Sequence, residues 1–142
     1  MEVLKIEGLT KQFGGLTAVS DVTFSVPKGK IYGLIGPNGA GKTTVYNLIT
    51  GIYQPTSGTI ELEGKSIVGH SCHDIVQKGI ARTFQNLRLF RKLSVLDNVI
   101  IARQYETKYR LWDAALRTKK FKESEKHLTE SSEELLKLVG LD

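Results

Sequence analysis

Residues 36–43 match the pattern G-x-x-x-x-G-K-[ST], which is typical of loops that wrap a polyphosphate. Its glycines permit the positive φ angles and the close approach that turn backbone N–H groups inward around an anion. Lys42 would set a mobile charge against the β- and γ-phosphates, and Thr43 would offer its hydroxyl to Mg²⁺. The predicted binding residues are Gly36, Pro37, Asn38, Gly39, Ala40, Gly41, Lys42, Thr43 and Thr44. The alternative is a chance glycine-rich turn before a helix.

The flanking residues supply the elements that such a loop needs. The apolar run at residues 31–36 predicts a buried strand, and residues 42–50 predict a helix whose N-terminus adds a partial positive charge. Further strands are predicted at residues 2–10, 22–26, 59–63 and 80–84, and a short helix at residues 73–79. The loop alone does not distinguish ATP from GTP. The chain contains no N-K-x-D base-reading pattern, which favours ATP.

The sequence changes character after Gln85. Glycine disappears until Gly140, charge rises, and two stretches show helical apolar spacing. Ser94 is a predicted N-cap with an acidic residue three positions on. Later in the segment, one apolar helix face is predicted from Leu128, Leu135, Leu138 and Val139.

The composition is that of a globular protein and does not identify its binding partner. The 142 residues are 40% hydrophobic, which is enough for a packed core. The net charge of +5 suits nucleotides, nucleic acid or an anionic membrane face. The single cysteine fits a reducing compartment, and the sequence shows neither a secretory signal nor a membrane-spanning apolar run.

The stretches GPNGAGKTT, GIYQPTSGTIELEGKSI and IARTFQNLRLFRKLSVLDNV, in this order, resemble the nucleotide-binding subunit of an ABC transporter. The resemblance implies an α/β fold: a P-loop NTPase core with an N-terminal antiparallel β-subdomain, followed by the start of a helical subdomain. We place the core at residues 1–85 and the helical part at residues 86–142. With the family's later parallel strands missing, we expect the core sheet to be incomplete.

The same resemblance assigns two more residues. Phe13 occupies the place of the aromatic residue that stacks on adenine in this family. Gln85 occupies the place of a glutamine that touches Mg²⁺ and the attacking water, so Lys42 and Gln85 are the implied catalytic residues and Thr43 and Gln85 the implied Mg²⁺ contacts. The alternatives are an ordinary core or edge aromatic and a surface glutamine.

Within the family, the sequence is similar to subunits that energise bacterial uptake of branched-chain or other hydrophobic amino acids. The implied partners are a permease, contacted just after Gln85, and a second ATP-binding subunit at the cytoplasmic face of the plasma membrane. Contact with the membrane would then be indirect, through the permease. The apolar residues that would line the permease groove, or else pack inside the helical part, are Leu87, Leu89, Phe90 and Val95.

Four family features are not found in these 142 residues: the L-S-G-G-Q-like signature, the aspartate strand, the catalytic glutamate and the switch histidine. We therefore expect a piece of a longer subunit that binds ATP and Mg²⁺ without turning ATP over. The alternative is a nucleotide-binding module that is complete at this length. A third interpretation, an ATPase acting on nucleic acid, lacks a supporting motif, and we expect no nucleic-acid partner.

Three other features carry weaker interpretations. A metal site at His70, Cys72 and His73 lacks a fourth ligand. The basic run at residues 117–122 could touch lipid headgroups or nucleic acid, but a solvated helix face is the favoured interpretation. Trp112 fits either the core of the helical part or a permease contact.

Overall fold

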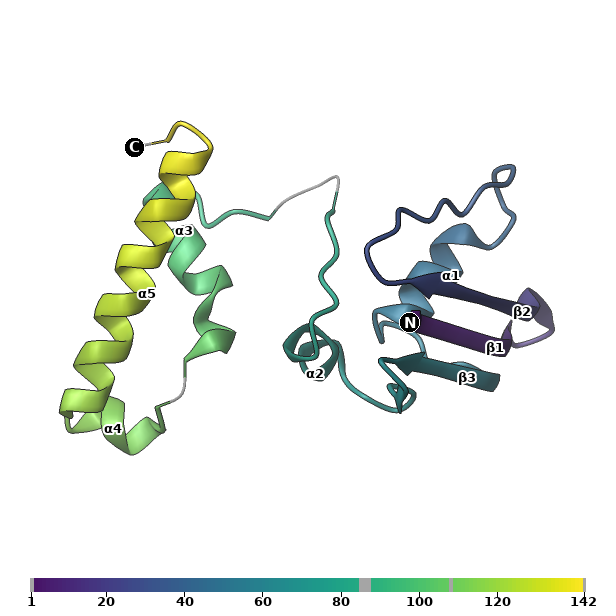
Figure 1. The fold of residues 1–142 in the computed structure, drawn as a ribbon, viewed down its shortest axis with the longest axis horizontal. Coiled ribbons are helices and arrows are strands. Elements are labelled where there is room, and N and C mark those ends of the chain that lie inside the picture. The colour runs from purple at the N-terminus through teal and green to yellow at the C-terminus, as the bar shows by residue number, and fades with distance from the viewer. Residues whose placement is uncertain (1, 85–87, 108, 142) are drawn as a thin grey trace. The chain divides into compact units, whose positions relative to one another are not determined.

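The computed structural model describes residues 2–84, 88–107 and 109–141 of the chain. It divides into two compact units, Met1–Thr83 and Phe84–Asp142. Figure 1 shows that strands gather in the first unit and that the second is helical. The predicted boundary after Gln85 falls outside the described residues and stays a prediction.

The first unit is built on a four-stranded antiparallel sheet with the strand order β2-β1-β3-β4. Its strands are β1 (Glu2–Phe13), β2 (Leu16–Pro27), β3 (Ser57–Leu62) and β4 (Lys65–Ser66). Short turns join β1 to β2 and β3 to β4, so neighbours in sequence pair in space, whereas β3 returns to the free side of β1. The strands expected at residues 2–10, 22–26 and 59–63 are therefore confirmed.

Helix α1 (Lys42–Ile49) packs against this sheet, and a second helix, α2 (Cys72–Gln77), contributes Ile75 to the same core. Their bounds are close to those of the helices expected at residues 42–50 and 73–79. The buried apolar core consists of Ile6, Leu9, Val19, Val45, Leu48, Ile49, Ile60, Ile67 and Ile75. Its members on α1 recur three or four residues apart and those on the strands lie on one face, as amphipathic elements require.

Two predicted strands are wrong. Residues 31–36 and 80–84 have no regular secondary structure, and Ile31 and Ile35 are 103% and 94% exposed. An apolar strand forms only where neighbouring strands accept its backbone hydrogen bonds and cover its side chains. Among the described residues, the sheet contains β1 to β4 and offers residues 31–36 no such neighbour.

The second unit pairs α3 (Val95–Ala102) with the long helix α5 (Lys119–Leu138). Between them lie the 3₁₀ turn η1 (Gln104–Glu106) and the short helix α4 (Leu111–Ala115). The predicted cap of α3 is confirmed: Ser94 accepts from the N–H of Asp97 at 3.0 Å, and the Asp97 carboxylate accepts from the N–H of Ser94 at 3.3 Å. No helix within the described residues is long and apolar enough to cross a membrane.

The apolar face predicted for the last helix is only partly buried. Leu128 is 4% exposed, whereas Leu135, Leu138 and Val139 are 45%, 81% and 67% exposed. The C-terminal end of α5 continues past α3 (Figure 1), so its side chains have less of the unit beside them. Of the four residues predicted for this face, the structure buries Leu128 alone.

Candidate functional site: the phosphate-binding loop

The candidate site of the first unit is the loop that leads into α1. Gly41 is the N-cap of α1 with a φ of 82°, and Gly39 has a φ of 84°. Both angles lie in the region that favours glycine. A Cβ on Gly41 would lie 2.5 Å from the carbonyl oxygen of Ala18 in β2, whereas one on Gly39 would meet nothing within 4 Å. Gly41 therefore lets the loop approach the sheet, and Gly39 serves the turn alone.

The ammonium group of Lys42 holds this loop together. Its Nζ donates to the carbonyl oxygens of Gly36 and Pro37, both at 2.6 Å. The N–H of Ala40 also donates to the Pro37 oxygen at 3.2 Å, which closes a turn inside the loop. The cation thus lies where the loop curves, satisfied by neutral oxygens that an anionic phosphate oxygen could replace with a stronger, charge-assisted interaction.

The N-terminus of α1 adds donors to the same place. The first N–H groups of a helix have no intrahelical partner, and the helix dipole gives this end a partial positive charge. Within the described residues, no hydrogen bond uses the N–H groups of Gly39, Lys42 or Thr43. The Thr43 hydroxyl is in the exposed first turn. Glycine geometry, free N–H donors and a central lysine fit a polyphosphate, and a hydroxyl beside them suits Mg²⁺.

Phe13 ends β1 and is 40% exposed, so its ring is open to a ligand. The Tyr53 ring meets it edge to face at 5.1 Å between centroids, and Lys11 Nζ lies 5.0 Å from its centroid. Lys11 is fixed in turn by donating to the Gln54 carbonyl at 2.7 Å. Lys11 lies two residues before Phe13 on the same strand face, so the sequence could have suggested its contact with the ring. No local pattern predicts the contact of Tyr53 with Phe13.

Gln85 lies outside the described residues, so its predicted role stays a prediction. The segment before it is tied to α1, because the Arg82 guanidinium donates to the side-chain oxygen of Asn47. Asn47 belongs to the same helix that begins at Lys42. This contact joins residues 35 positions apart, which is too far along the chain for a local sequence pattern to predict.

The histidines and cysteine near residue 72 do not converge. Among the described residues, no group of three His, Cys, Asp or Glu side chains could hold a metal ion. Cys72 is exposed, and the His73 ring lies 3.0 Å from the Gln77 amide. The Ser71 hydroxyl, at the N-cap of α2, donates to the Asp74 carboxylate at 2.7 Å, and this hydrogen bond lowers the pKa of Asp74.

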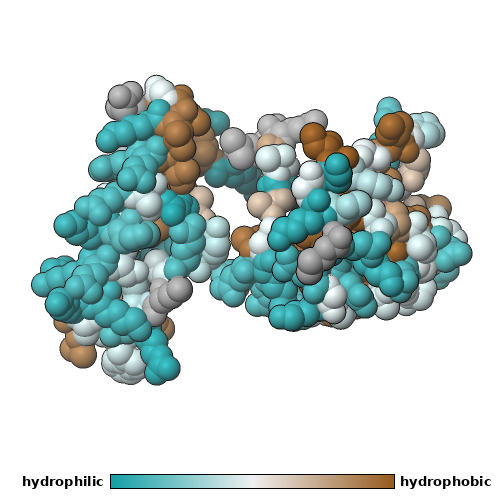
Figure 2. All heavy atoms as spheres, viewed as in Figure 1, coloured by the Kyte–Doolittle hydropathy of each residue, from teal (hydrophilic) through white to brown (hydrophobic). Residues whose placement is uncertain are grey.

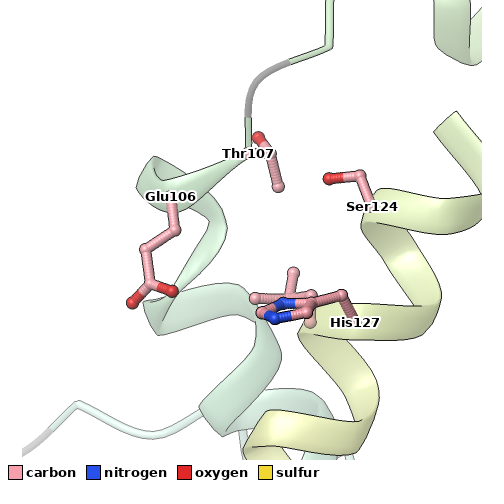
Figure 3. A pocket seen from close by; sticks show the side chains of 5 residues that line it. Glu106, Thr107, Ser124 and His127 are labelled. Carbon is pink, nitrogen blue, oxygen red and sulfur yellow. The ribbon is translucent and has the colours of Figure 1, made fainter. Parts of the chain in front are cut away.

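A hollow of about 400 Å³ in the helical unit is a weaker candidate. Figure 3 shows Glu106, Thr107, Ser124 and His127 around it, with Leu128 completing the lining. The Glu106 carboxylate is already paired with the Arg103 guanidinium at 2.7 Å, and this bond lowers the pKa of Glu106. With its one carboxylate engaged in this way, the hollow presents no set of groups suited to catalysis.

The fold and the loop together define a nucleotide-binding protein of the phosphate-loop class. Comparison with known proteins takes the assignment further. The chain belongs to the ABC transporter family, whose sequence profile matches residues 19–141.

Curated relatives carry the resemblance over nearly the whole chain. The high-affinity branched-chain amino acid transport ATP-binding protein BraF of Pseudomonas aeruginosa is 42% identical over 98% of this chain and 54% of its own length. The corresponding protein LivG of Escherichia coli is 40% identical with the same coverage. A probable LivG of Archaeoglobus fulgidus is 43% identical over 72% of the chain. The chain thus spans about half the length of the first two relatives.

Solved structures confirm the predicted fold class. A nucleotide-free ATP-binding cassette from an ABC transporter superposes with a TM-score of 0.77 at 32% identity, covering 99% of this chain and 55% of that one. The ADP conformation of another such cassette gives a TM-score of 0.68 at 34% identity over 84% of this chain and 46% of that one. The chain therefore has part of the α/β fold of an ABC ATPase.

Proposed function

We propose that this chain is an ATP-binding part of a bacterial ABC importer for branched-chain or other hydrophobic amino acids, at the cytoplasmic face of the plasma membrane. The observation that carries the proposal is the Lys42 ammonium, held by two loop carbonyls at the N-terminus of α1. The names of the relatives that match 98% of the chain support the amino-acid class.

Each residue of the loop has a role in this proposal. The N–H groups of Gly39, Lys42 and Thr43, unpaired within the described residues, would surround the phosphates, and Lys42 would exchange its two carbonyl partners for β- and γ-phosphate oxygens. Thr43 and Gln85 contact Mg²⁺, and Gln85 also orients water without adding charge beside the γ-phosphate. Bound ATP supplies the phosphoanhydride bond whose hydrolysis would drive transport.

Phe13 provides the stacking face for adenine. Because Tyr53 and Lys11 contact its ring, its orientation is restricted before a base arrives. Stacking on an aromatic face tolerates either purine, so Phe13→Ala should weaken ATP and GTP binding together, while Phe13→Tyr should retain it. Loss of ATP binding without loss of GTP binding would contradict a role limited to stacking.

We further propose that the 142-residue chain binds ATP without turning it over. The chain contains no signature motif and no family glutamate to activate water. Two copies of this chain would then lack the groups that complete each other's sites in the family's dimer. Phosphate release from Mg-ATP checks this: the purified chain should release none above background, whereas release abolished by Lys42→Ala would show turnover.

The permease surface is proposed to lie just after Gln85. Leu89, Phe90 and Val95 are 64%, 56% and 57% exposed, while Leu87 lies outside the described residues. Asn98 holds this segment, because its side-chain oxygen accepts from the N–H of Phe90 at 2.9 Å and its amide donates to the Phe90 carbonyl at 3.2 Å. The apolar side chains are thus presented from a fixed backbone.

Transport tests the amino-acid assignment. In the complete subunit assembled with its permease, leucine uptake should require ATP and should be lost with Lys42→Ala. Phe90→Asp should reduce permease binding while ATP binding persists, and Leu138→Asp, a control at an exposed apolar residue of α5, should leave both intact. An assembly that carries sugars and not leucine would overturn the substrate class and leave the ATP site in place.

A further inference from the structure

The tip of the helical unit carries apolar side chains that are largely exposed. On α4, Leu111 and Trp112 are 88% and 78% exposed, and Leu116 at its C-cap is 75% exposed. Helical spacing places these three residues on one side of α4. Figure 2 shows hydrophobic atoms at the α4 end of the unit, with hydrophilic side chains around them.

The opposite side of α4 is fixed to the unit. The Asp113 carboxylate accepts from the N–H of Arg110 at 3.0 Å and from the Thr118 hydroxyl at 3.1 Å. Tyr109 packs edge to face on Phe121 of α5 at 5.0 Å. These contacts of Asp113 and Tyr109 fix the orientation of α4. The exposure of Leu111, Trp112 and Leu116 is therefore a property of the folded unit.

The apolar side is framed by cations. Residues 110–122 contain five basic residues and one acidic residue, a formal net charge of +4. The acidic residue is Asp113, which is engaged within the tip. The basic residues are all exposed, and Lys119 lies 3.7 Å from the exposed Glu123, a pair that water screens strongly.

One cation is kept at the cost of backbone strain. Arg117 joins α4 to α5 with a φ of 49°, in the region that favours glycine. Glycine would relieve this strain, so Arg117→Gly removes the charge without straining the backbone.

We propose that this tip, Leu111, Trp112 and Leu116 with its basic frame, docks on an anionic phospholipid surface. Tryptophan prefers the headgroup region of a bilayer, aliphatic side chains enter the acyl boundary, and lysine and arginine attract anionic lipids. Nucleic acid would use the same charges, but Leu111 and Leu116 offer a base neither a stacking face nor a hydrogen bond. The contact is additional to the proposed permease surface and does not depend on ATP.

Trp112 is the chain's single tryptophan and reports the contact directly. With vesicles of phosphatidylcholine and phosphatidylglycerol, the chain should sediment and Trp112 emission should shift to shorter wavelength. Vesicles of phosphatidylcholine alone should do neither. No binding, equal binding to both vesicles, or binding without a change at Trp112 would each overturn the proposal. An emission shift produced by raising protein concentration without lipid, or by a DNA oligonucleotide, would overturn it in favour of a second copy or of nucleic acid.

Matched variants separate the two contributions. Leu111→Ser with Leu116→Ser should weaken vesicle binding by at least about tenfold, because buried apolar area is lost. Arg117→Gly should weaken it about fivefold while relieving the backbone, so misfolding is not the cause. Leu138→Ser and Lys137→Gln, exposed controls on α5, should leave binding unchanged. Equal losses in the controls would overturn the assignment to the tip, with circular dichroism confirming that each variant is helical.

Failure of this inference is distinguishable from failure of the proposed function. Lys42→Ala should lose ATP and keep vesicle binding, and the tip variants should do the reverse. Vesicle binding that vanishes with Lys42→Ala would contradict an independent lipid surface.

Discussion

The two units of this chain differ in how much apolar surface they bury. The sheet unit buries nine apolar residues in one cluster, eight of them from three strands and two helices and the ninth, Ile67, from the loop after β4. In the helical unit, Leu128 and Ser132 are the buried residues among those described. Antiparallel strands that follow one another in sequence can close a core locally, whereas two helices and a short third one cannot surround themselves.

In the helical unit, where fewer apolar side chains are buried, polar contacts join the helices. The Arg103 guanidinium donates to Glu106 at 2.7 Å on its own side and to the Ser131 hydroxyl of α5 at 2.9 Å. Ser132 is fully buried and donates to the Leu128 carbonyl at 2.6 Å. The difference implies that the phosphate loop rests on the more stable unit, and that the helical unit depends on caps and charged bonds.

Core truncation should show the largest contrast. Ile60→Ala removes a side chain that is 1% exposed and should cost the sheet unit about 2–5 kcal/mol. Leu128→Ala should cost less in absolute terms but a larger share of the helical unit's smaller stability. Hydrogen exchange measured by mass spectrometry resolves the two units. The account would be contradicted if the amides of α5 stayed protected from exchange in Leu128→Ala and those of the sheet stayed equally protected in Ile60→Ala.

Substitution of the two loop glycines tests how closely the loop approaches β2 in the sheet unit. Gly39→Ala and Gly41→Ala both place a side chain at positive φ, at a cost of about 1–3 kcal/mol each. Gly41→Ala also forces a Cβ against the Ala18 carbonyl oxygen, so it should cost more and abolish ATP binding. Urea unfolding and calorimetry check both. Equal losses for the two variants would contradict the close approach of the loop to β2.

The helix caps give a smaller, matched effect. Ser94→Ala in the helical unit and Ser71→Ala in the sheet unit each remove a capping box and should each cost about 1 kcal/mol. Because the helical unit has less burial to lose, Ser94→Ala should expose more amides to exchange. Ser94→Asp keeps a capping oxygen and should restore protection; failure to do so would mean that the cap is not the cause.

Acid should produce the smallest difference. The hydrogen bond from Arg103 holds the pKa of Glu106 below its unfolded value of about 4.3. A lowered pKa gives stability that is present above the unfolded value and is lost as the pH falls through the folded value. The helical unit should therefore loosen below about pH 4, and Glu106→Gln should remove this part of the dependence. Trp112 fluorescence during an acid titration measures it; an unchanged titration in the variant would remove Glu106 from the account.

The sequence predicted what short stretches determine. The hairpin strands alternate and the Ser94 cap needs four residues, so both appear in the structure. The loop before α1 is also a local pattern, and its binding of phosphate stays a prediction. The strand at residues 31–36 failed because a strand of this kind depends on neighbours that no local pattern supplies. The contacts of Tyr53 with Phe13 and of Arg82 with Asn47 join distant residues and had no periodic signal.

The exposure of α4 was also beyond prediction. The sequence left Trp112 between a core and a surface role, and it favoured a merely solvated face for residues 117–122. Only the structure shows that Asp113 is bonded inward while Leu111 and Trp112 face outward beside exposed cations. Spacing gives the sides of a helix, and tertiary contacts decide which side is covered.

The central claim is that the loop at α1 is assembled and binds ATP through Lys42. The most direct test is calorimetric titration of Mg-ATP into the purified chain, with Lys42→Ala and the control Lys30→Ala beside it. The account predicts saturable binding by the wild type and by Lys30→Ala, and none by Lys42→Ala. Absence of binding by the wild type, or undiminished binding by Lys42→Ala, would contradict it.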